Sequence, residues 1–364
     1  MENTVQRAGT RIKVRPRAVT GSAATVTVVV SCYNYAHYLP QAVQSCLSQR
    51  DVDVDVIIVD DASTDSSLSV ARGLAAQNRN VSVLAHSSNK GMVETFNDGA
   101  RAATGEFLVR LDADDLLTPG SLARATQVAR AYPSVGLVYG HPIHFSTAVL
   151  PEPREEARAW TIWPGGDWLK DRCRTVQNVI TSPEALMRRS VIEGIGYQAA
   201  LRHTPDMEFW MRIAAFADIA YVHGADQAWH RDHPGSMSAT EVDGRTDLSD
   251  RFDAFEALFT GVARDMPGSA ELFRQARMAL VNEALYTARL EADRGLHDRG
   301  LFQAYLDFAK DLEPGIEHSA AWQGLIRRTR NRRSPVRPLP LFRRLHGRVR
   351  SAVNWHRWHR NGVF

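Results

Sequence analysis

The sequence predicts an α/β protein whose core is a mostly parallel sheet flanked by helices, followed by a helical C-terminal extension. Short β-branched runs recur about every 26 residues over the first 140 positions, with segments of helical periodicity between them. Strand–helix–strand units of this kind form right-handed crossovers that cover a parallel sheet on both faces. Polar clusters follow several of the apolar runs. They predict a ligand site at the carboxyl ends of the strands, where open α/β sheets bind their ligands.

The expected elements alternate in chain order. Strands are expected over 26–31, 54–59, 81–85, 107–111 and 136–139, and helices over 40–48, 66–77, 93–103 and 207–216. A further helix is expected to begin at Thr118 and Pro119, because threonine caps a helix whose first turn tolerates proline, and to end before Pro133. From about residue 250 to 328 the pattern is helical.

The organisation of the chain follows from these patterns. We expect a disordered basic leader over 1–23 and an α/β catalytic domain over 24–240. A helical region over 241–330 and an arginine-rich tail over 331–364 follow. The tail interleaves arginines with tryptophans and aliphatic residues, which suits contact with an anionic membrane face, although a disordered or docked tail remains an alternative.

The composition is that of a globular protein and shows no bias toward a disordered or fibrous one. The chain has 364 residues, of which 44% are hydrophobic and 23% charged, which is typical of a globular protein. Three cysteines without paired spacing predict reduced thiols and a cytoplasmic location. No run approaches the roughly 18 apolar residues that a membrane-spanning helix needs. The protein is therefore expected in the cytoplasm, with peripheral contact at the inner membrane face as a hypothesis.

An acidic cluster follows the apolar run at 107–111. Asp112 and Asp114 are two residues apart, so their carboxylates can turn the same way and repel one another unless a cation neutralises them. Hard divalent ions prefer such oxygen ligands and can in turn hold phosphate oxygens. A solvated turn with capping aspartates is the alternative explanation of this cluster by itself.

The motifs around this acidic cluster favour a metal site over a solvated turn. Val-Ser-Cys-Tyr-Asn ends the first strand, Val-Asp-Asp-Ala-Ser-Thr-Asp ends the second, and the run Asn89 to Asn97 precedes the Asp-Ala-Asp segment. Their order and spacing resemble the N-terminal half of the family 2 glycosyltransferases, which have the GT-A fold. The resemblance extends over about 26–238. It implies an inverting enzyme that uses a nucleotide-sugar donor and a divalent metal, Mg²⁺ or Mn²⁺.

The resemblance also implies roles for individual residues. At the donor site, Ser31 and Tyr33 would frame the nucleobase, and Asp61 would accept a hydrogen bond from a uracil ring. Arg231 would contact the diphosphate. The other residues assigned to the donor site are Asn34, Lys90, Gly91, Asn97 and Asp112. The metal would be held by Asp112, Asp114 and His233. UDP is the nucleotide that the resemblance favours.

Inverting transfer needs a base that takes the proton of the attacking hydroxyl. Asp206 is the candidate, since Thr204 to Arg212 resembles the acidic segment that opens a helix near the acceptor in this family. The usual Glu-Asp pair is replaced here by Pro205 and Asp206. Capping of the following helix is the alternative role of Asp206, and the two roles are compatible.

Other functions remain open at this point. A nucleotidyltransferase would also bind nucleotide and metal beyond a parallel sheet, but it would usually have a glycine-rich loop after the first strand. A non-catalytic protein with the same fold could act as a scaffold through its basic tail. The acceptor could be a saccharide, a lipid-linked saccharide or a natural product, and no nucleic-acid partner is expected. The Gln-any-any-Arg-Trp signature of processive synthases is absent, which favours a single transfer per encounter.

Overall fold

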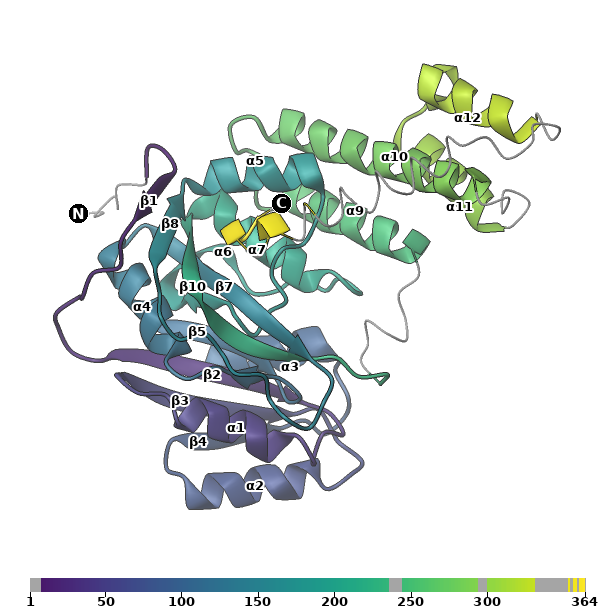
Figure 1. Ribbon diagram of the computed structural model, residues 1–364. Helices are drawn as coiled ribbons and strands as arrows, with labels where there is room; N and C mark the ends of the chain where they lie inside the picture. The colour runs from purple at the N-terminus through teal and green to yellow at the C-terminus, as the bar shows by residue number, and fades with distance from the viewer. Residues whose placement is uncertain are drawn as a thin grey trace. The chain divides into compact units, whose positions relative to one another are not determined.

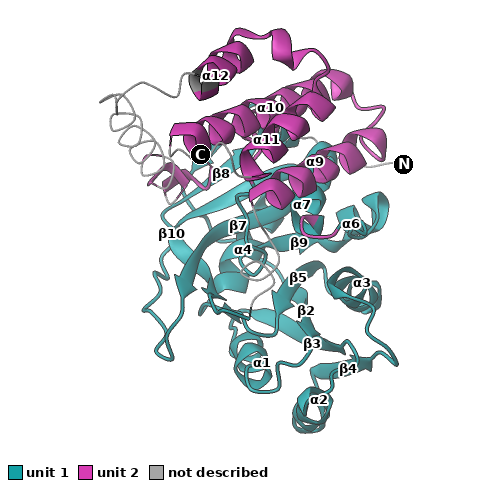
Figure 2. Ribbon diagram, turned by 90° about the vertical axis from the view of Figure 1, so that its right-hand side faces the viewer, with its two compact units in different colours: residues 1–169, 178–201, 205–239 teal, residues 170–177, 202–204, 240–364 magenta. Residues whose placement is uncertain are grey.

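The computed structural model describes residues 8–235, 244–293, 300–330, 353, 356–358 and 360–363. The chain forms two compact units, which are coloured separately in Figure 2. Unit 1 takes residues 1–169, 178–201 and 205–239, and unit 2 takes residues 170–177, 202–204 and 240–364. The candidate site residues of the sequence all fall in unit 1.

Unit 1 is an α/β unit. Its strands are β1 (Ile12–Val14), β2 (Ala24–Cys32), β3 (Val52–Asp60), β4 (Val81–Ala85), β5 (Phe107–Asp112), β6 (Leu116–Leu117), β7 (Val135–Phe145), β8 (Ala159–Trp163), β9 (Leu186–Arg188) and β10 (Asp218–Arg231). Its helices are α1 (Leu39–Leu47), α2 (Ser67–Gln77), α3 (Met92–Ala102), α4 (Ser121–Ala131), α6 (Arg189–Ile195) and α7 (Pro205–Phe216), and α5 (Gly165–Thr175) begins in it. All strands and helices expected over the first 140 residues are present, but α4 begins at Ser121 after Gly120 and is not capped by Thr118 as the sequence predicted.

The described strands form one sheet in the order β1-β8-β10-β7-β9-β5-β2-β3-β4, with β6 paired to β10 (Figure 1). β4, β3, β2 and β5 run parallel to one another. β2 lies between β3 and β5, so the chain reverses its direction of winding at β2. In sheets of this type the crevice beyond the carboxyl ends at such a point binds the ligand. The α/β class predicted from the sequence is confirmed.

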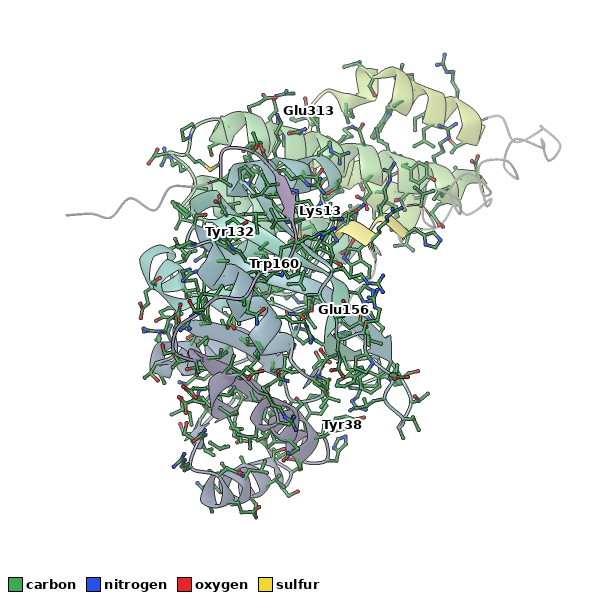
Figure 3. The ribbon with its side chains drawn as sticks, turned by 60° about the vertical axis from the view of Figure 1, so that its left-hand side comes forward. Lys13, Tyr38, Tyr132, Glu156, Trp160 and Glu313 are labelled. Carbon is green, nitrogen blue, oxygen red and sulfur yellow. The ribbon has the colours of Figure 1, made fainter. Side chains whose placement is uncertain are left out.

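The other half of the sheet is mixed. β9 lies between β5 and β7 and is antiparallel to both, while β7 and β10 are parallel. β8 and β1 add antiparallel strands at one edge. The strand β1 corrects the prediction of a disordered leader over 1–23: Val14 pairs with the buried Trp160, and Lys13 of the same strand points to the surface (Figure 3). Ile12 and Val14 pack against the core, which stabilises this short edge strand.

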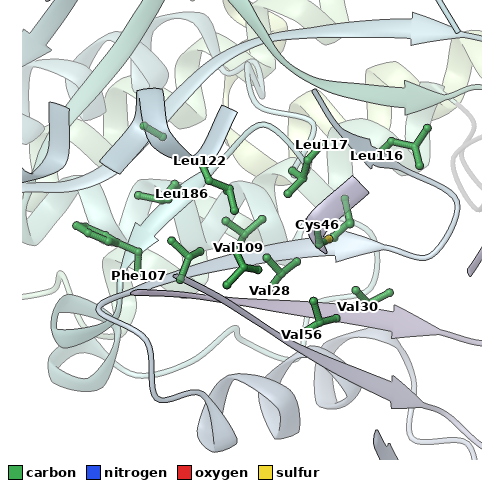
Figure 4. Packing of buried hydrophobic residues seen from close by; sticks show 14 of the residues in the cluster. Val28, Val30, Cys46, Val56, Phe107, Val109, Leu116, Leu117, Leu122 and Leu186 are labelled. Carbon is green, nitrogen blue, oxygen red and sulfur yellow. The ribbon is translucent and has the colours of Figure 1, made fainter. Parts of the chain in front are cut away.

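The two faces of β2 pack against different helices. Val28 and Val30 belong to the buried cluster that includes Cys46 of α1, and Figure 4 shows these side chains together. Val29 points to the opposite face because side chains alternate along a strand. On that face α3 approaches so closely that Gly99 faces the methyl groups of Val29. The absence of a side chain at Gly99 permits this approach.

Unit 2 is helical in the part that the structure describes. It contains α9 (Gly244–Thr260), α10 (Ser269–Asp293), α11 (Gly300–Leu312), η1 (Ile316–His318) and α12 (Ala320–Arg330). The longest of these, α10, contacts α9, α11 and α12. Most of the predicted arginine-rich tail over 331–364 lies outside the described residues. Among the helices that are described, none combines the length and the apolar character needed to cross a membrane.

Candidate functional site

The carboxyl ends of β2, β3 and β5 meet at one edge of the sheet. Ser31 is paired in register with Val59 of β3 and with Asp112 of β5, and its carbonyl accepts a hydrogen bond from the backbone of Ala113 at 3.1 Å. The Ser31 hydroxyl is buried and has no hydrogen-bond partner among the described residues. The Tyr33 side chain is 45% exposed at the end of β2. An exposed aromatic ring beside an unused hydroxyl is suited to receive a planar ligand.

Asn34 connects the loops that follow β2 and β3. Its backbone adopts the left-handed conformation, with φ of 60°, which asparagine tolerates better than most residues. The Asn34 Oδ1 atom accepts hydrogen bonds from the backbone of Thr64 at 2.8 Å and of Asp65 at 3.3 Å. The Asn34 backbone donates to Ser63 Oγ at 3.0 Å. The role of Asn34 seen in the structure is therefore to hold two site loops together.

Asp61 holds the loop before α3. Its carboxylate accepts hydrogen bonds from His86 Nδ1 at 2.7 Å and from the backbone amides of Lys90 at 2.7 Å and Gly91 at 2.9 Å. Burial raises the pKa of Asp61, but these hydrogen bonds outweigh it and hold that pKa below its usual value. The carboxylate is only 4% exposed, so a direct contact with a nucleobase needs a rearrangement of this loop. The Lys90 ammonium is half exposed and pairs with Asp98 at 2.8 Å.

Asn97 has a structural role instead of the expected contact with the donor. It is 2% exposed, and its Nδ2 and Oδ1 atoms bond the backbone carbonyl and amide of Gln198, each at 3.0 Å. Both polar atoms of the amide are therefore engaged by the fold. This corrects the prediction from the sequence, in which the asparagine was assigned from its place in a motif and its burial could not be seen.

Asp112 and Asp114 of the acidic cluster contact different partners. Asp112 is one-third exposed and lies 3.2 Å from the buried guanidinium of Arg110. Asp114 lies 2.9 Å from His233 Nε2, which is also 3.4 Å from the hydroxyl of Tyr35. Burial raises the pKa of Asp114, and the neighbouring charge of Asp112 raises it further, while His233 partly offsets both effects. A bound cation would stabilise the ionised form of a carboxylate in this environment.

The expected metal triad is only partly assembled. Asp114 and His233 are in contact, whereas Asp112 is turned to Arg110. Within the described ranges, Asp112, Asp114 and His233 do not form a group whose ligand atoms all lie within 4.8 Å of one another. The donor set that is present, a carboxylate and an imidazole with a second carboxylate nearby, still fits Mn²⁺ or Mg²⁺ once Asp112 releases Arg110.

Asp115, the third acid of the cluster, links β5 to the end of β10. It is 1% exposed, and it accepts hydrogen bonds from His230 Nδ1 at 3.1 Å and from the Arg231 backbone at 2.8 Å. Burial raises the pKa of Asp115 to about 6. The pKa of His230 is raised to about 9, because its interactions with Asp115 outweigh the effect of burial. The two groups therefore form an ion pair in the neutral range.

The Arg231 side chain is positioned by two aromatic rings. Its guanidinium lies 4.4 Å from the ring centre of Tyr38 and 4.5 Å from that of Phe145. It donates from Nε to the backbone carbonyl of Asp114 at 2.8 Å and from Nη2 to Gln41 at 3.0 Å. The structure thus places a fixed cation beside the acidic cluster, as an anionic ligand there requires.

Asp206 lies in the first turn of α7 and is partly exposed. Its Oδ2 atom accepts a hydrogen bond from Asn178 Nδ2 at 2.8 Å. Burial raises the pKa of Asp206, and the positive charge of Arg110 partly offsets this rise. Arg110 thus pairs with Asp112 of the acidic cluster, and its positive charge lowers the pKa of Asp206 of α7. The charge of one buried guanidinium therefore acts on both groups of candidate residues.

Comparison with known proteins identifies the fold around these residues. A family model described as "Glycosyl transferase family 2" matches residues 27–196, which include β2, β3, β5 and the acidic cluster. The chain therefore contains a family 2 glycosyltransferase domain over residues 27–196. An uncharacterized glycosyltransferase of Nostoc sp. is 40% identical over 114 residues, a match that covers 31% of this chain and 35% of that relative. The chain thus aligns with about a third of the length of this relative.

Solved structures share the architecture of this chain. Residues 1–349 of S. aureus TarS, solved with UDP-GlcNAc, have 16% identity and a TM-score of 0.50, covering 80% of this chain and 92% of that one. The mannosyltransferase PcManGT from Pyrobaculum calidifontis, solved with GDP-Man and Mn²⁺, has 20% identity and a TM-score of 0.50, covering 83% and 90%. These likenesses confirm the GT-A fold.

Several contacts of the family 2 domain were not anticipated from the sequence. The contact of Arg110 with Asp112 is one of them. A charged residue within an apolar strand does indicate that a buried partner exists, and this signal could have been used. The hydrogen bond between Asn178 and Asp206, and the pair of Asp115 with His230, join residues 28 and 115 positions apart. No local pattern in the sequence indicates contacts over such separations.

Proposed function

We propose that the protein transfers a sugar from a nucleotide-diphosphate donor, a UDP-sugar, to a hydroxyl of a saccharide, lipid-linked saccharide or natural-product acceptor, with inversion at the anomeric carbon. The observation that carries the proposal is the arrangement around Arg110. Its guanidinium pairs with Asp112 of an acidic cluster suited to a metal-bound diphosphate, and its charge lowers the pKa of Asp206, a carboxylate suited to act as a base.

The donor would occupy the edge of the sheet beyond β2 and β5. The exposed ring of Tyr33 and the buried, unpaired hydroxyl of Ser31 support a nucleobase site at the end of β2. The guanidinium of Arg231, fixed beside Asp114, supports a diphosphate site. Backbone amides at Lys90 and Gly91 are held in place by Asp61, so this loop would line the donor without a direct base contact from that carboxylate.

Asp114 and His233 would hold the divalent ion, with Asp112 joining them. The ion, when bound, would neutralise charge on the leaving diphosphate. The raised pKa of Asp114 and its contact with His233 support this assignment. Of the two neighbouring structures, one holds a GDP-sugar with Mn²⁺ and the other a UDP-sugar. UDP therefore remains the first donor to test, and GDP the second.

Asp206 would accept the proton of the attacking hydroxyl. Its pKa is raised by burial, which increases its basicity while leaving it ionised above that pKa. Asn178 donates to one carboxylate oxygen and so orients the other. Because attack would come from the face opposite the diphosphate, a base on α7 rather than on the β2–β5 edge suits inversion.

The test begins with nucleotide binding. UDP, GDP, dTDP and CDP are titrated by calorimetry with and without Mn²⁺ into the parent protein, Asp114→Ala and Asp53→Ala. Asp53 is exposed near the amino end of β3, so its substitution is a matched control for loss of a carboxylate.

Metal-dependent binding of one nucleotide, retained in Asp53→Ala and lost in Asp114→Ala, supports the proposal and selects the donor. The anomeric configuration of the product, measured by NMR, then decides inversion. Absence of binding by every nucleotide under every condition contradicts the proposal.

A further inference from the structure

We propose that His144, His230 and Asp232 bind a transition-metal ion such as Zn²⁺, at a site separate from the one at Asp114. In the part of the chain that the structure describes, this is the group of metal-ligating side chains whose ligand atoms all lie within 4.8 Å of one another. The proposed donor reaction uses none of the three.

The strand pairing brings the three side chains together. His144 of β7 and His230 of β10 are direct partners in the parallel register. Their ring centres are 4.9 Å apart. Asp232 follows His230 by two positions, and its Oδ1 atom lies 3.2 Å from His144 Nδ1. Two imidazoles from adjacent strands and the carboxylate that directly follows β10 are thus presented together.

The separations suit a metal ion. Ligand atoms about 2.0–2.2 Å from a zinc ion in a tetrahedral site lie roughly 3.3 Å from one another. One ligand pair of the group, His144 and Asp232, already has this spacing, and all ligand atoms of the group lie within 4.8 Å of one another. Two imidazoles with one carboxylate favour Zn²⁺, Co²⁺ or Cu²⁺ over the hard ions Mg²⁺ and Ca²⁺, which prefer oxygen ligands.

The surroundings of His230 strengthen this assignment. Metal-binding histidines usually donate their second ring nitrogen to a carboxylate, which fixes the tautomer and the ring orientation. His230 does so in this structure, since its Nδ1 atom bonds the buried Asp115 at 3.1 Å. That bond leaves Nε2 of His230 as the nitrogen for a metal. His144 and Asp232 are exposed, so the ion has a route from solvent.

Asp115 also gives the site a physical connection to the donor edge. It is adjacent in sequence to Asp114 and accepts a hydrogen bond from the Arg231 backbone. A metal on His230 would therefore fix the proton on the nitrogen that faces Asp115. The new site would be coupled to the acidic cluster without sharing a ligand with it.

The experiment uses the full chain without an affinity tag, treated with a chelator and dialysed. Zn²⁺ is titrated by calorimetry into the protein carrying Asp114→Asn, so that the donor-metal site does not contribute. In that background, His144→Ala and Asp232→Asn are compared with His318→Ala, a histidine of unit 2 that serves as the control. Melting curves of all variants verify that they fold.

We expect one Zn²⁺ per chain, with affinity reduced at least tenfold by His144→Ala and by Asp232→Asn but unchanged by His318→Ala. Electron paramagnetic resonance of bound Cu²⁺ gives an independent readout, with nitrogen splitting from two imidazoles in the parent and from one in His144→Ala. Absence of Zn²⁺ binding in the folded protein overturns the proposal. So does equal affinity in all of these variants.

Discussion

Replacement of Asp206 by asparagine is the most direct test of the proposed chemistry. Asparagine keeps the size of the side chain and an oxygen that can accept the bond from Asn178 Nδ2, which is 2.8 Å in the parent. The variant loses the basic oxygen alone. General-base catalysis contributes about 10²- to 10⁴-fold to the rate. That loss corresponds to about 2.7–5.4 kcal/mol of transition-state stabilisation.

The assay separates binding from chemistry. With the donor selected by titration, kcat of Asp206→Asn should fall by about 10²- to 10⁴-fold, and the dissociation constant of the nucleotide should stay within about twofold. The control is Asp53→Asn, which removes the same charge near the amino end of β3. A kcat within threefold of the parent would refute the role of Asp206 as the base.

Three further predictions concern charge and packing. Arg110→Gln should move the acidic limb of the pH profile of kcat/KM to higher pH, because the positive charge that lowers the pKa of Asp206 is removed; an unmoved limb would argue against this coupling. Asp226→Asn should lower the free energy of unfolding by about 2 kcal/mol at pH 7. Hydrogen bonds from His141 and Arg154 outweigh burial and lower the pKa of Asp226, so its stabilisation is present above about pH 4 and disappears as the pH falls; urea unfolding at pH 7 and pH 3 measures the difference. Gly99→Ala should lower the free energy of unfolding by about 1 kcal/mol, because the added Cβ atom would lie 2.4 Å from a methyl group of Val29 and this clash exceeds the gain in helix propensity. A melting temperature above that of the parent would contradict this prediction.

The parallel half of the fold was predictable because its central strands contain apolar runs that are buried on both faces. Residues 28–30 of β2 and 56–59 of β3 are such runs, and they are readily detected in the sequence. The antiparallel strands were not predicted. β9 and β1 have three residues each, too few for a pattern, and their pairing depends on distant partners. Irregular register in β10 obscures its alternation further.

The candidate site shows the same division. Tyr33 and Asp114 could be proposed from the sequence because they directly follow strands whose ends must meet. The grouping of Asp114 with His233 came only from the family resemblance, and the contact of Asp115 with His230 was not proposed, since both histidines lie more than a hundred residues away along the chain. Asn97 was assigned from motif position alone, and burial gave it another role.

The position of β10 limits how the domain can be divided. The family match ends at residue 196, yet β10 runs from Asp218 to Arg231 and lies in the sheet between β7 and β8. A fragment cut at the family boundary would expose the long edge of β7 to aggregation. It would also lose both histidines that contact the acidic cluster. A fragment of this protein that keeps the complete sheet and the acidic cluster with its histidines therefore has to extend at least to His233.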